Sequence, residues 1–353
     1  MSHHTVGIVG GGQLGRMLAM AAARLGLHTI ILEPQDKCPA AQVAGSQITA
    51  EYDDDDALDT LAVLSDVITY EFENVPVASA RKLAEKKPVF PPPAALEISQ
   101  DRLTEKTFLR TCGIPTADFV AVDSQLEIDE ALAGLGGSGV LKTRRLGYDG
   151  KGQRVFEGPE AKTAHAFADL GAVPLILEGL VPFVAEISVI AARSPDGSVA
   201  SYEPSRNHHA DGLLRRSVVP AGLPQSTLDT ARNHAASLLE KLDYVGVVGV
   251  EFFVLDDGEV LANEFAPRVH NSGHWTEAAC AVSQFEQHMR AICGLPLGTC
   301  DRHSDCEMEN LIGDDIDRLD TFLNQPDTVV HVYGKAEARP GRKMGHVTRL
   351  ISL

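Results

Sequence analysis

Two glutamates, Glu251 and Glu264, are candidate metal ligands because a predicted β-hairpin would place them side by side. Each lies in a largely apolar run, and an Asp-Asp-Gly-Glu segment at 256–259 separates the two runs. A turn of two or four residues puts Glu251 directly opposite Glu264, with Cβ atoms about 4.5–5.5 Å apart. Facing carboxylates destabilise a sheet unless a cation neutralises them, and Mg²⁺ binds carboxylate and phosphate oxygens together. The spacing therefore predicts a Mg²⁺ site rather than two exposed strand glutamates, provided that the turn has an even number of residues.

A glycine-rich loop that follows a short strand is typical of a phosphate site. The strand, 139–142, ends in Lys142, and residues 144–154 interleave glycines with arginines and a lysine. Backbone N–H groups and cations of such a loop bind phosphate oxygens, and a mobile loop can close over them. The loop lacks the Gly-Lys-Ser/Thr of a Walker A sequence, and a surface hairpin tip is the alternative interpretation.

Two other predicted strands carry single glutamates. Glu178 lies in the apolar run 175–180, and Glu186 follows Phe183 and Val184. A carboxylate there can accept a hydrogen bond from a ribose hydroxyl or from an adenine amine. Both residues are candidate nucleotide ligands, and both are equally compatible with exposed strand positions.

The N-terminus has the pattern of a β-α-β unit. A strand, 6–9, precedes the Gly-rich turn 10–15, and a helix with apolar residues every three to four positions runs to Gly26. A second strand, 29–32, ends at Glu33. The turn matches the G-x-G-x-x-G fingerprint of dinucleotide-binding domains. Because the same turn packs helix on strand in sheets that bind no NAD, a structural role or another ligand is favoured.

Acidic residues also follow a third predicted strand, 67–70. Ligands of open α/β sheets bind at the carboxyl ends of strands. Glu71 and Glu73 would point to one side of the chain if it stayed extended. A solvated acidic loop is the alternative.

Local signals predict how the first domain ends. Asp53 to Asp56 indicate a solvated helix start rather than a metal site, since four adjacent acids do not converge on one ion. Four prolines within 88–93 exclude a helix or central strand and predict a domain boundary. Ser99 is the predicted N-cap of the next helix, which Gly113 terminates.

The composition excludes several classes of protein. A net charge of −18 argues against a broad nucleic-acid-binding face. No apolar run approaches the roughly 18 residues of a membrane span, and no signal-peptide pattern precedes the first strand. The six cysteines form no C-x-x-C pair, which favours reduced thiols in a cytoplasmic protein. A length of 353 residues predicts two or three domains.

Together these features resemble the ATP-grasp superfamily. Within it, the chain is similar to the N5-carboxyaminoimidazole ribonucleotide synthetase family of purine biosynthesis, also called the ATPase subunit of the AIR carboxylase pair. The segments that carry this resemblance are 10–17, 69–76, 147–153, 266–276 and 339–346. Many superfamily members have an asparagine where this chain has Ala266, so metal coordination is expected to rest on Glu251 and Glu264.

The resemblance implies an α/β protein with the ATP-grasp fold and three parts. A Rossmann-like (pre-ATP-grasp) parallel-sheet domain is expected at 1–97, and an ATP-grasp domain with a mobile lid at about 113–180 is expected at 98–292. A small β-rich C-terminal domain, 293–353, would complete the substrate site.

The resemblance also implies a reaction. ATP, bicarbonate and 5-aminoimidazole ribonucleotide (AIR) would give ADP, phosphate and the N5-carbamate through carboxyphosphate, with Mg²⁺ as cofactor. The implied ATP site consists of Arg102, Lys142, Gly147, Tyr148, Asp149, Gly150, Lys151, Gly152, Gln153, Glu178, Gly179, Leu180, Val181, Glu186, His209, Asn263 and Glu264.

The implied ribonucleotide site lies beside it. Its residues would be Gln13, Leu14, Glu73, Asn74, Tyr148, Arg154, His270, Asn271, Ser272, Lys335, Arg342 and Lys343. Arg268 would bind the anionic acceptor, and Asp149 and His270 are the candidates for moving the amine proton. The basic residues of the final hairpin, which also include Arg339 and His346, suit the substrate phosphate, although Arg339 is equally compatible with a surface turn.

The expected partners are small molecules, a second copy of the chain in a homodimer, and a separate mutase that takes the product. Neither nucleic acid nor membrane is expected. The nearest alternative is another ATP-grasp ligase, such as the formate-dependent glycinamide ribonucleotide transformylase or biotin carboxylase. An NAD-dependent oxidoreductase is more remote, because it would use only the first glycine turn.

Overall fold

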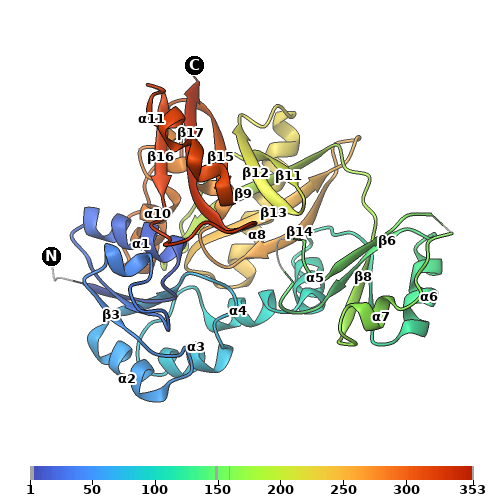
Figure 1. Ribbon diagram of the computed structural model, residues 1–353, viewed down its shortest axis with the longest axis horizontal. Coiled ribbons are helices and arrows are strands. Elements are labelled where there is room, and N and C mark those ends of the chain that lie inside the picture. Colours follow the sequence, from blue (N-terminus) through green and yellow to red (C-terminus); the bar gives the residue numbers. More distant parts are fainter. Residues whose placement is uncertain (1–3, 148–149, 159, 352–353) are drawn as a thin grey trace.

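The computed structural model describes residues 4–147, 150–158 and 160–351, and within them three sheets form the frame (Figure 1). The N-terminal sheet is parallel, with strand order β3-β2-β1-β4. Its strands are β1 (Thr5–Val9), β2 (His28–Leu32), β3 (Ser46–Ile48) and β4 (Val67–Tyr70). The helices that follow are α1 (Gln13–Arg24), α2 (Asp55–Leu64), α3 (Val77–Ala84), α4 (Pro93–Ser99) and α5 (Arg102–Thr111).

Both faces of the parallel sheet are covered, which explains why its strands are apolar throughout. Val6 and Ile8 belong to one core cluster with α1, whereas Ile68 and Tyr70 belong to another with α2 and α3. The first of these clusters continues into α10 (Gln284–Ile292) of the large sheet domain. The N-terminal domain and the body therefore share one core.

The second sheet is small and antiparallel, with the order β5-β8-β6-β7, and it projects from the body in Figure 1. Its strands are β5 (Phe119–Val122), β6 (Gly139–Thr143), β7 (Gln153–Phe156) and β8 (Leu175–Gly179). Helices α6 (Gln125–Gly134) and α7 (Ala166–Asp169) cover one face with a core of their own. This sheet carries Lys142, the glycine-rich loop and Glu178.

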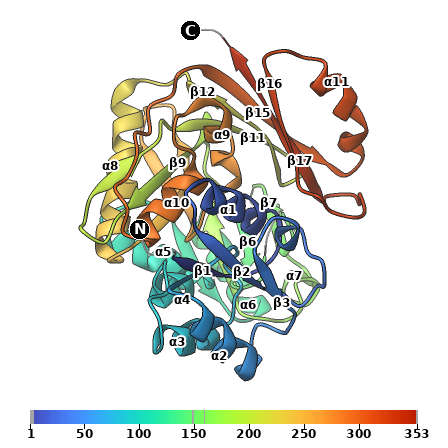
Figure 2. The same ribbon diagram turned by 90° about the vertical axis from the view of Figure 1, so that its left-hand side faces the viewer.

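The third sheet is the antiparallel body, with the order β14-β13-β9-β11-β12-β15-β17-β16 and β10 beside β9. Its strands are β9 (Ala185–Arg193), β10 (Val199–Ser201), β11 (Ser205–Ala210), β12 (Leu213–Val219), β13 (Gly246–Val254), β14 (Val260–Ala266), β15 (Asp305–Ile312), β16 (Thr328–Val332) and β17 (Lys343–Ile351). The remaining helices are α8 (Gln225–Lys241), α9 (Thr276–Ala279), α10 and α11 (Leu319–Leu323), with 3₁₀ turns at Ala40–Gln42 (η1), Asn271–Gly273 (η2) and Gly313–Arg318 (η3). Figure 2 shows β15 to β17 at the top, above the N-terminal domain.

Two local predictions about the first domain need correction. Asp101, not Ser99, is the N-cap of α5, because its carboxylate accepts from the N–H groups of Leu103 and Thr104. Ser99 instead ends α4. The chain also turns directly after β4, so Glu71 is not extended strand and lies buried rather than solvated. The interpretation of 53–56 as a helix start is confirmed, since Asp54 caps α2.

The turn of the β13–β14 hairpin has an odd number of residues, contrary to the prediction. Gly258 N–H donates to Leu255 O at 3.0 Å, and Leu255 N–H donates to Glu259 O at 2.9 Å. Gly258 adopts φ +88°, the left-handed conformation that favours glycine. The loop therefore consists of residues 256–258, the three-residue turn with a glycine bulge.

A bulge in β14 nevertheless returns the two glutamates to opposite positions. Val254 pairs with Val260, one step away from the predicted register. Asn263 then has no partner on β13, and Glu251 pairs with Glu264. The predicted pairing of Glu251 with Glu264 is confirmed, but for a different reason. The odd-numbered turn shifts the register by one residue, and the extra residue of the bulge shifts it back.

Two further findings concern membrane-spanning helices and the cysteines. Within the described ranges no helix combines the length and apolar character needed to cross a membrane. The cysteines all fall in the described part of the chain, and each is a free thiol.

Candidate active site

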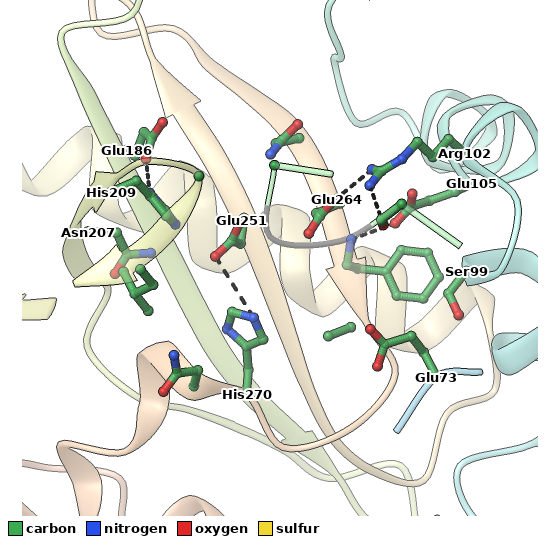
Figure 3. A pocket seen from close by; sticks show the side chains of 18 of the residues that line it. Glu73, Ser99, Arg102, Glu105, Glu186, Asn207, His209, Glu251, Glu264 and His270 are labelled. Atoms are coloured by element: carbon green, nitrogen blue, oxygen red, sulfur yellow. Dashed lines mark hydrogen bonds and ion pairs between the residues drawn. The ribbon is translucent and has the colours of Figure 1, made fainter. Parts of the chain in front are cut away.

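A cavity of about 650 Å³ opens between the three sheets (Figure 3). Its wall combines the carboxyl ends of the N-terminal strands, the second sheet (β5-β8-β6-β7, hereafter the lid sheet, since it falls in the expected lid), and strands β9, β11, β13 and β14 of the body. Many sequence-predicted residues meet there: Gln13, Leu14, Glu73, Asn74, Arg102, Lys142, Gly147, Gly150, Gln153, Glu186, His209, Glu251, Asn263, Glu264, Arg268, His270, Asn271 and Lys343.

The two facing glutamates have opposite electrostatic surroundings. Burial, together with the nearby Glu264 carboxylate, raises the pKa of Glu251 to about 7. Burial also disfavours the charged form of Glu264, but Arg102, which lies 2.9 Å away, outweighs it and lowers the pKa of Glu264 to about 2. Glu264 therefore has a close cationic partner, whereas burial and Glu264 disfavour the charged form of Glu251, which a metal ion would stabilise.

Glu178 lies between two lysines at the base of the lid. Its Oε2 is 3.0 Å from Lys142 Nζ and 3.2 Å from Lys106 Nζ. Burial raises the pKa of Glu178, but the two lysines outweigh it, so the net pKa is lowered. Its other oxygen, Oε1, is buried without a hydrogen-bond partner among the described residues. Lys106 was not predicted as a site residue.

The glycine-rich loop reaches across the cavity to the β11–β12 turn. A Cβ on Gly150 would lie 3.1 Å from the Cα of Gly212, and Gly150 has φ +76°. Gly152 packs on Thr143 of β6, where a Cβ would be 2.8 Å from the hydroxyl oxygen. Tyr148 and Asp149 lie outside the described residues. The loop is thus in close contact with the opposite side of the cavity.

An apolar slot lies beside this loop. The rings of Phe183 and Phe253 stack with centroids 4.8 Å apart, and Val140 and Val155 line the same cavity. These side chains present a flat apolar surface of the kind that binds a planar aromatic group.

A contact between His209 and Glu186 lies on the wall near this slot. Burial disfavours the charged form of His209, but its hydrogen bond with Glu186 outweighs burial and raises the imidazole pKa. The two side chains thus present a linked polar pair to the cavity.

Arg268 and Glu73 form an ion pair between the body and the N-terminal domain. The Arg268 side chain is 15% exposed, and Glu73 offsets the burial cost, so the guanidinium pKa is raised. Burial opposes ionisation of Glu73, but Arg268 lowers its net pKa. The cation is therefore held in one orientation at the cavity wall.

The segment after Arg268 supplies neutral polar groups. His270 Nδ1 lies 2.8 Å from Ser272 Oγ, and its Nε2 lies 3.9 Å from Glu251 Oε1. Burial lowers the pKa of His270 to about 3, so the ring is neutral near pH 7. Both side-chain amide atoms of Asn271 are buried without a partner among the described residues. Ser272 is behind the wall, where it accepts a hydrogen bond from Ser188 at 2.6 Å.

Only part of the basic final hairpin faces the cavity. Lys343 lines it, and Lys335 Nζ donates to Lys343 O at 2.8 Å. Arg342 donates to Glu337 O at 3.0 Å. Arg339 is exposed and paired with the Glu337 carboxylate, as expected of a surface turn.

His346 is not part of this cationic group, contrary to the sequence interpretation. It is buried beside His331, with ring centroids 4.6 Å apart, and its Nδ1 lies 2.8 Å from Tyr333 Oη. Burial lowers its pKa well below that of an ordinary histidine, so the ring carries no charge for a phosphate.

Several predicted residues lie off the cavity wall. Arg154 alternates with the wall residues Gln153 and Val155, so it points to the other face of β7, where it pairs with Asp169 at 3.2 Å. Others lie at the end of β8, directly after it, or in the glycine-rich loop: Glu178, Gly179, Leu180, Val181, Lys151 and Gly152.

The first glycine turn is filled by the protein's own acids. Glu71 accepts hydrogen bonds from the N–H groups of Gly12 and Gly15 at 2.5 and 2.6 Å, at the start of α1. Glu33 accepts from Gly11 N–H at 2.8 Å. In dinucleotide-binding domains the cofactor pyrophosphate occupies this helix N-terminus. The structure therefore argues against NAD binding there.

Comparison with known proteins is consistent with this geometry along the chain. Residues 3–100 match the ribonucleotide synthetase preATP-grasp domain, 107–285 the ATP-grasp domain, and 306–352 the phosphoribosylaminoimidazole carboxylase C-terminal domain. The N5-carboxyaminoimidazole ribonucleotide synthase of Brucella melitensis is 63% identical, over 98% of this chain and 96% of its own. The chain belongs to the N5-carboxyaminoimidazole ribonucleotide synthase family.

Solved structures of this family have the same fold. An N5-carboxyaminoimidazole ribonucleotide synthetase in complex with ADP matches 99% of this chain and 93% of its own, with a TM-score of 0.96 and 42% identity. The Aspergillus clavatus enzyme in complex with ADP and AIR matches 99% of this chain and 94% of its own, with a TM-score of 0.91 and 31% identity. The predicted ATP-grasp ligase fold is thereby confirmed.

Three residues at the cavity wall or buried beside it were not predicted from the sequence. Glu105 and Lys106 follow Arg102 by three and four positions on α5, and such a spacing puts side chains on one helix face. That spacing was a usable signal. Asn207 gave no comparable signal, because only the pairing of β11 with β9, which places it beside Glu186, brings it to the cavity.

Proposed function

We propose that this chain carboxylates the amine of AIR at the expense of ATP, with carboxyphosphate as the intermediate. The observation that carries the proposal is the Glu251–Glu264 pair, which faces a cavity that also contains Lys142 and Arg268. The A. clavatus relative, solved with ADP and AIR, supports both substrates. Such a site combines a phosphoryl donor site with a cation for an anionic acceptor.

The residues present fit Mg²⁺. Two carboxylates meet at the cavity, and burial together with the neighbouring Glu264 raises the pKa of Glu251 to about 7, so its charged form is the one that a cation would favour. Among the described side chains no group of three or more His, Cys, Asp or Glu residues could hold an ion alone. Mg²⁺ characteristically completes its coordination with water and substrate phosphates. When bound, it would neutralise charge on the transferred phosphoryl group.

ATP would lie between the lid and the body. The stacked Phe183 and Phe253 suit the adenine ring, and the linked Glu186 and His209 suit the ribose hydroxyls. Lys142 and Arg102 would bind phosphate oxygens. The loop 147–152 would exclude water, because carboxyphosphate hydrolyses readily when exposed.

The chemistry then has two steps. A bicarbonate oxygen attacks the γ-phosphorus of ATP, the bond to ADP breaks, and Arg268 stabilises the resulting carboxyphosphate. The AIR amine nitrogen attacks the carboxyl carbon, phosphate leaves, and the amine proton is released. His270, whose ring is neutral near pH 7, and Asp149 are the two candidates for handling that proton.

The ribonucleotide would lie between the N-terminal domain and the final hairpin. Lys343, Lys335 and Arg342 form the cationic group proposed for its phosphate, and Gln13 and Asn74 are on the facing wall. We also propose the division into 1–97, 98–292 and 293–353. A homodimer in the cytoplasm that passes its product to a separate mutase would complete the assignment.

A coupled assay of phosphate release tests the proposal. With ATP and Mg²⁺ present, AIR plus bicarbonate should stimulate phosphate release, and the N5-carbamate should form in step with it. Glycinamide ribonucleotide plus formate should not stimulate. Stimulation by the second pair alone would assign the chain to a different ATP-grasp reaction.

A further inference from the structure

Helix α5 contacts the outer edge of β14 with two buried ionisable side chains that the proposed reaction does not use. Glu105 Oε1 accepts a hydrogen bond from Phe265 N–H at 2.7 Å. Lys106 Nζ donates to Asn263 O at 3.0 Å. The residues are 2% and 1% exposed, respectively. The two contacts flank Glu264 on either side.

These contacts are made where the sheet itself provides no support. β14 is the edge strand of the body sheet, so no further strand of that sheet pairs with its outer side. Just before the bulge, Ala262 N–H donates to Pro115 O at 2.7 Å, in an isolated bridge with the segment after α5. Asn263 also lacks a partner on β13. A buried backbone group without a hydrogen bond destabilises the folded state, so the edge needs other partners. Glu105 supplies the acceptor and Lys106 supplies the donor.

The bulge determines which way Glu264 points. Without the bulge, the register of the pairs Val254–Val260 and Phe252–Ala262 would continue along the strand, and Asn263 would lie opposite Glu251. A one-residue shift moves a strand side chain to the opposite face of the sheet. Glu264 would then leave the cavity, and the carboxylate pair would be lost.

Lys106 has a second contact that connects the bulge to the lid. The same Nζ lies 3.2 Å from Glu178 Oε2, at the end of lid strand β8. Glu178 also contacts Lys142, so it keeps a cationic partner when Lys106 is replaced. Among the described hydrogen bonds Glu105 makes no contact with Glu178. A Glu105 variant therefore tests support of the bulge separately from the link to the lid.

We propose that Glu105 and Lys106 are positioning residues that fix the β14 bulge, and thereby keep Glu264 facing Glu251 and the metal–nucleotide complex. The proposal rests on the proposed function, in which the pair binds Mg²⁺ with the nucleotide. In this proposal Glu105 acts through the oxygen that accepts from Phe265 N–H. A variant that loses the charge but keeps an acceptor oxygen should therefore retain the function, and a variant that loses both should not.

Calorimetric titration with ADP, in MgCl₂ and in EDTA, tests the proposal without turnover. Mg²⁺ should tighten ADP binding to the unaltered protein. Glu105→Leu should reduce that Mg²⁺-dependent gain by about 10–100-fold, the usual effect of losing support behind a metal ligand. Affinity for ADP in EDTA should change little. Glu105→Gln, whose amide oxygen can still accept from Phe265 N–H, should retain most of the Mg²⁺-dependent increase in ADP affinity.

Matched variants keep the result interpretable. Thr107→Ala changes an exposed neighbour on α5 whose hydroxyl donates to Leu103 O of its own helix, and it should behave as the unaltered protein. If Glu105→Leu does not fold, Lys106→Met provides the same test, since it removes the donor to Asn263. An unchanged Mg²⁺-dependent gain in Glu105→Leu, or in Lys106→Met, would overturn the proposal. So would a Glu105→Gln variant as impaired as Glu105→Leu. Absence of a Mg²⁺ effect in the unaltered protein would instead contradict the metal assignment itself.

Discussion

Glu251 and Glu264 face each other across β13 and β14, although the strand register changes by one residue between the turn and the pair. Arg102 compensates only Glu264, so the two carboxyl pKa values differ widely, at about 7 and about 2. This asymmetry leaves one charge for an added cation to stabilise.

Glu264→Gln should lower turnover by about 10²–10³-fold, as expected when a group that stabilises transition-state charge is removed. The amide keeps the size of the side chain but provides no negative charge for Mg²⁺ or Arg102. Steady-state phosphate release measures the effect, and circular dichroism checks the fold. Glu259→Gln, an exposed position on the same hairpin, should be nearly unaffected. Full activity in Glu264→Gln would count against the metal assignment.

Mg²⁺ binding should weaken as the pH falls through about 7, the pKa of Glu251. This pKa is raised, so the metal-free site carries a proton on Glu251 below pH 7 and loses it above. Mg²⁺ must displace that proton at pH 6 but not at pH 8. Calorimetry in buffers of different ionisation enthalpy should therefore detect proton release only at the lower pH. Glu251→Gln should abolish the release, and equal release at both pH values would refute the assignment.

Lys343→Met should raise KM for AIR by about 10–100-fold, the value of a charge-assisted hydrogen bond to phosphate. KM for ATP should change little, because Lys343 belongs to the final hairpin rather than to the lid. Initial rates at varied AIR measure the effect. Arg339→Met removes a cation of the same hairpin that is exposed and paired with Glu337, and it serves as the control. If both variants raised KM equally, the general charge of the hairpin would be responsible instead.

Gly150→Ala should increase the phosphate released per molecule of carbamate formed. The new Cβ would lie 3.1 Å from Gly212 Cα, so the loop could no longer approach the opposite wall as closely. Water would then reach carboxyphosphate more often. Gly158→Ala is a matched control, because Gly158 has a similar φ of +77° but no atoms near the added Cβ. An unchanged product ratio in Gly150→Ala would show that this contact does not protect the intermediate.

Local sequence patterns were sufficient for much of this protein. Apolar runs, glycine turns and the Asp-Gly signal predicted the N-terminal β-α-β unit, the lid strand that ends in Lys142, and the β13–β14 hairpin. Motifs in chain order predicted the ATP-grasp family. These features depend on residues close together in the chain, whose periodicity and backbone preferences are readable without a partner.

Contacts between segments far apart in the chain could not be predicted from such local patterns. Glu105 and Lys106 contact β14 across 160 and 157 residues, and their partners are backbone atoms that leave no mark on composition. Glu71 fills the first glycine turn from 59 residues away, and His346 is buried among other rings instead of facing a phosphate. The amino-acid order thus predicted the two carboxylates and a hairpin between them, but not the three-residue length of its turn. The bulge that makes them face each other arose only in the packed molecule, because a backbone carbonyl and N–H at a sheet edge take their partners from whatever element the fold brings beside them.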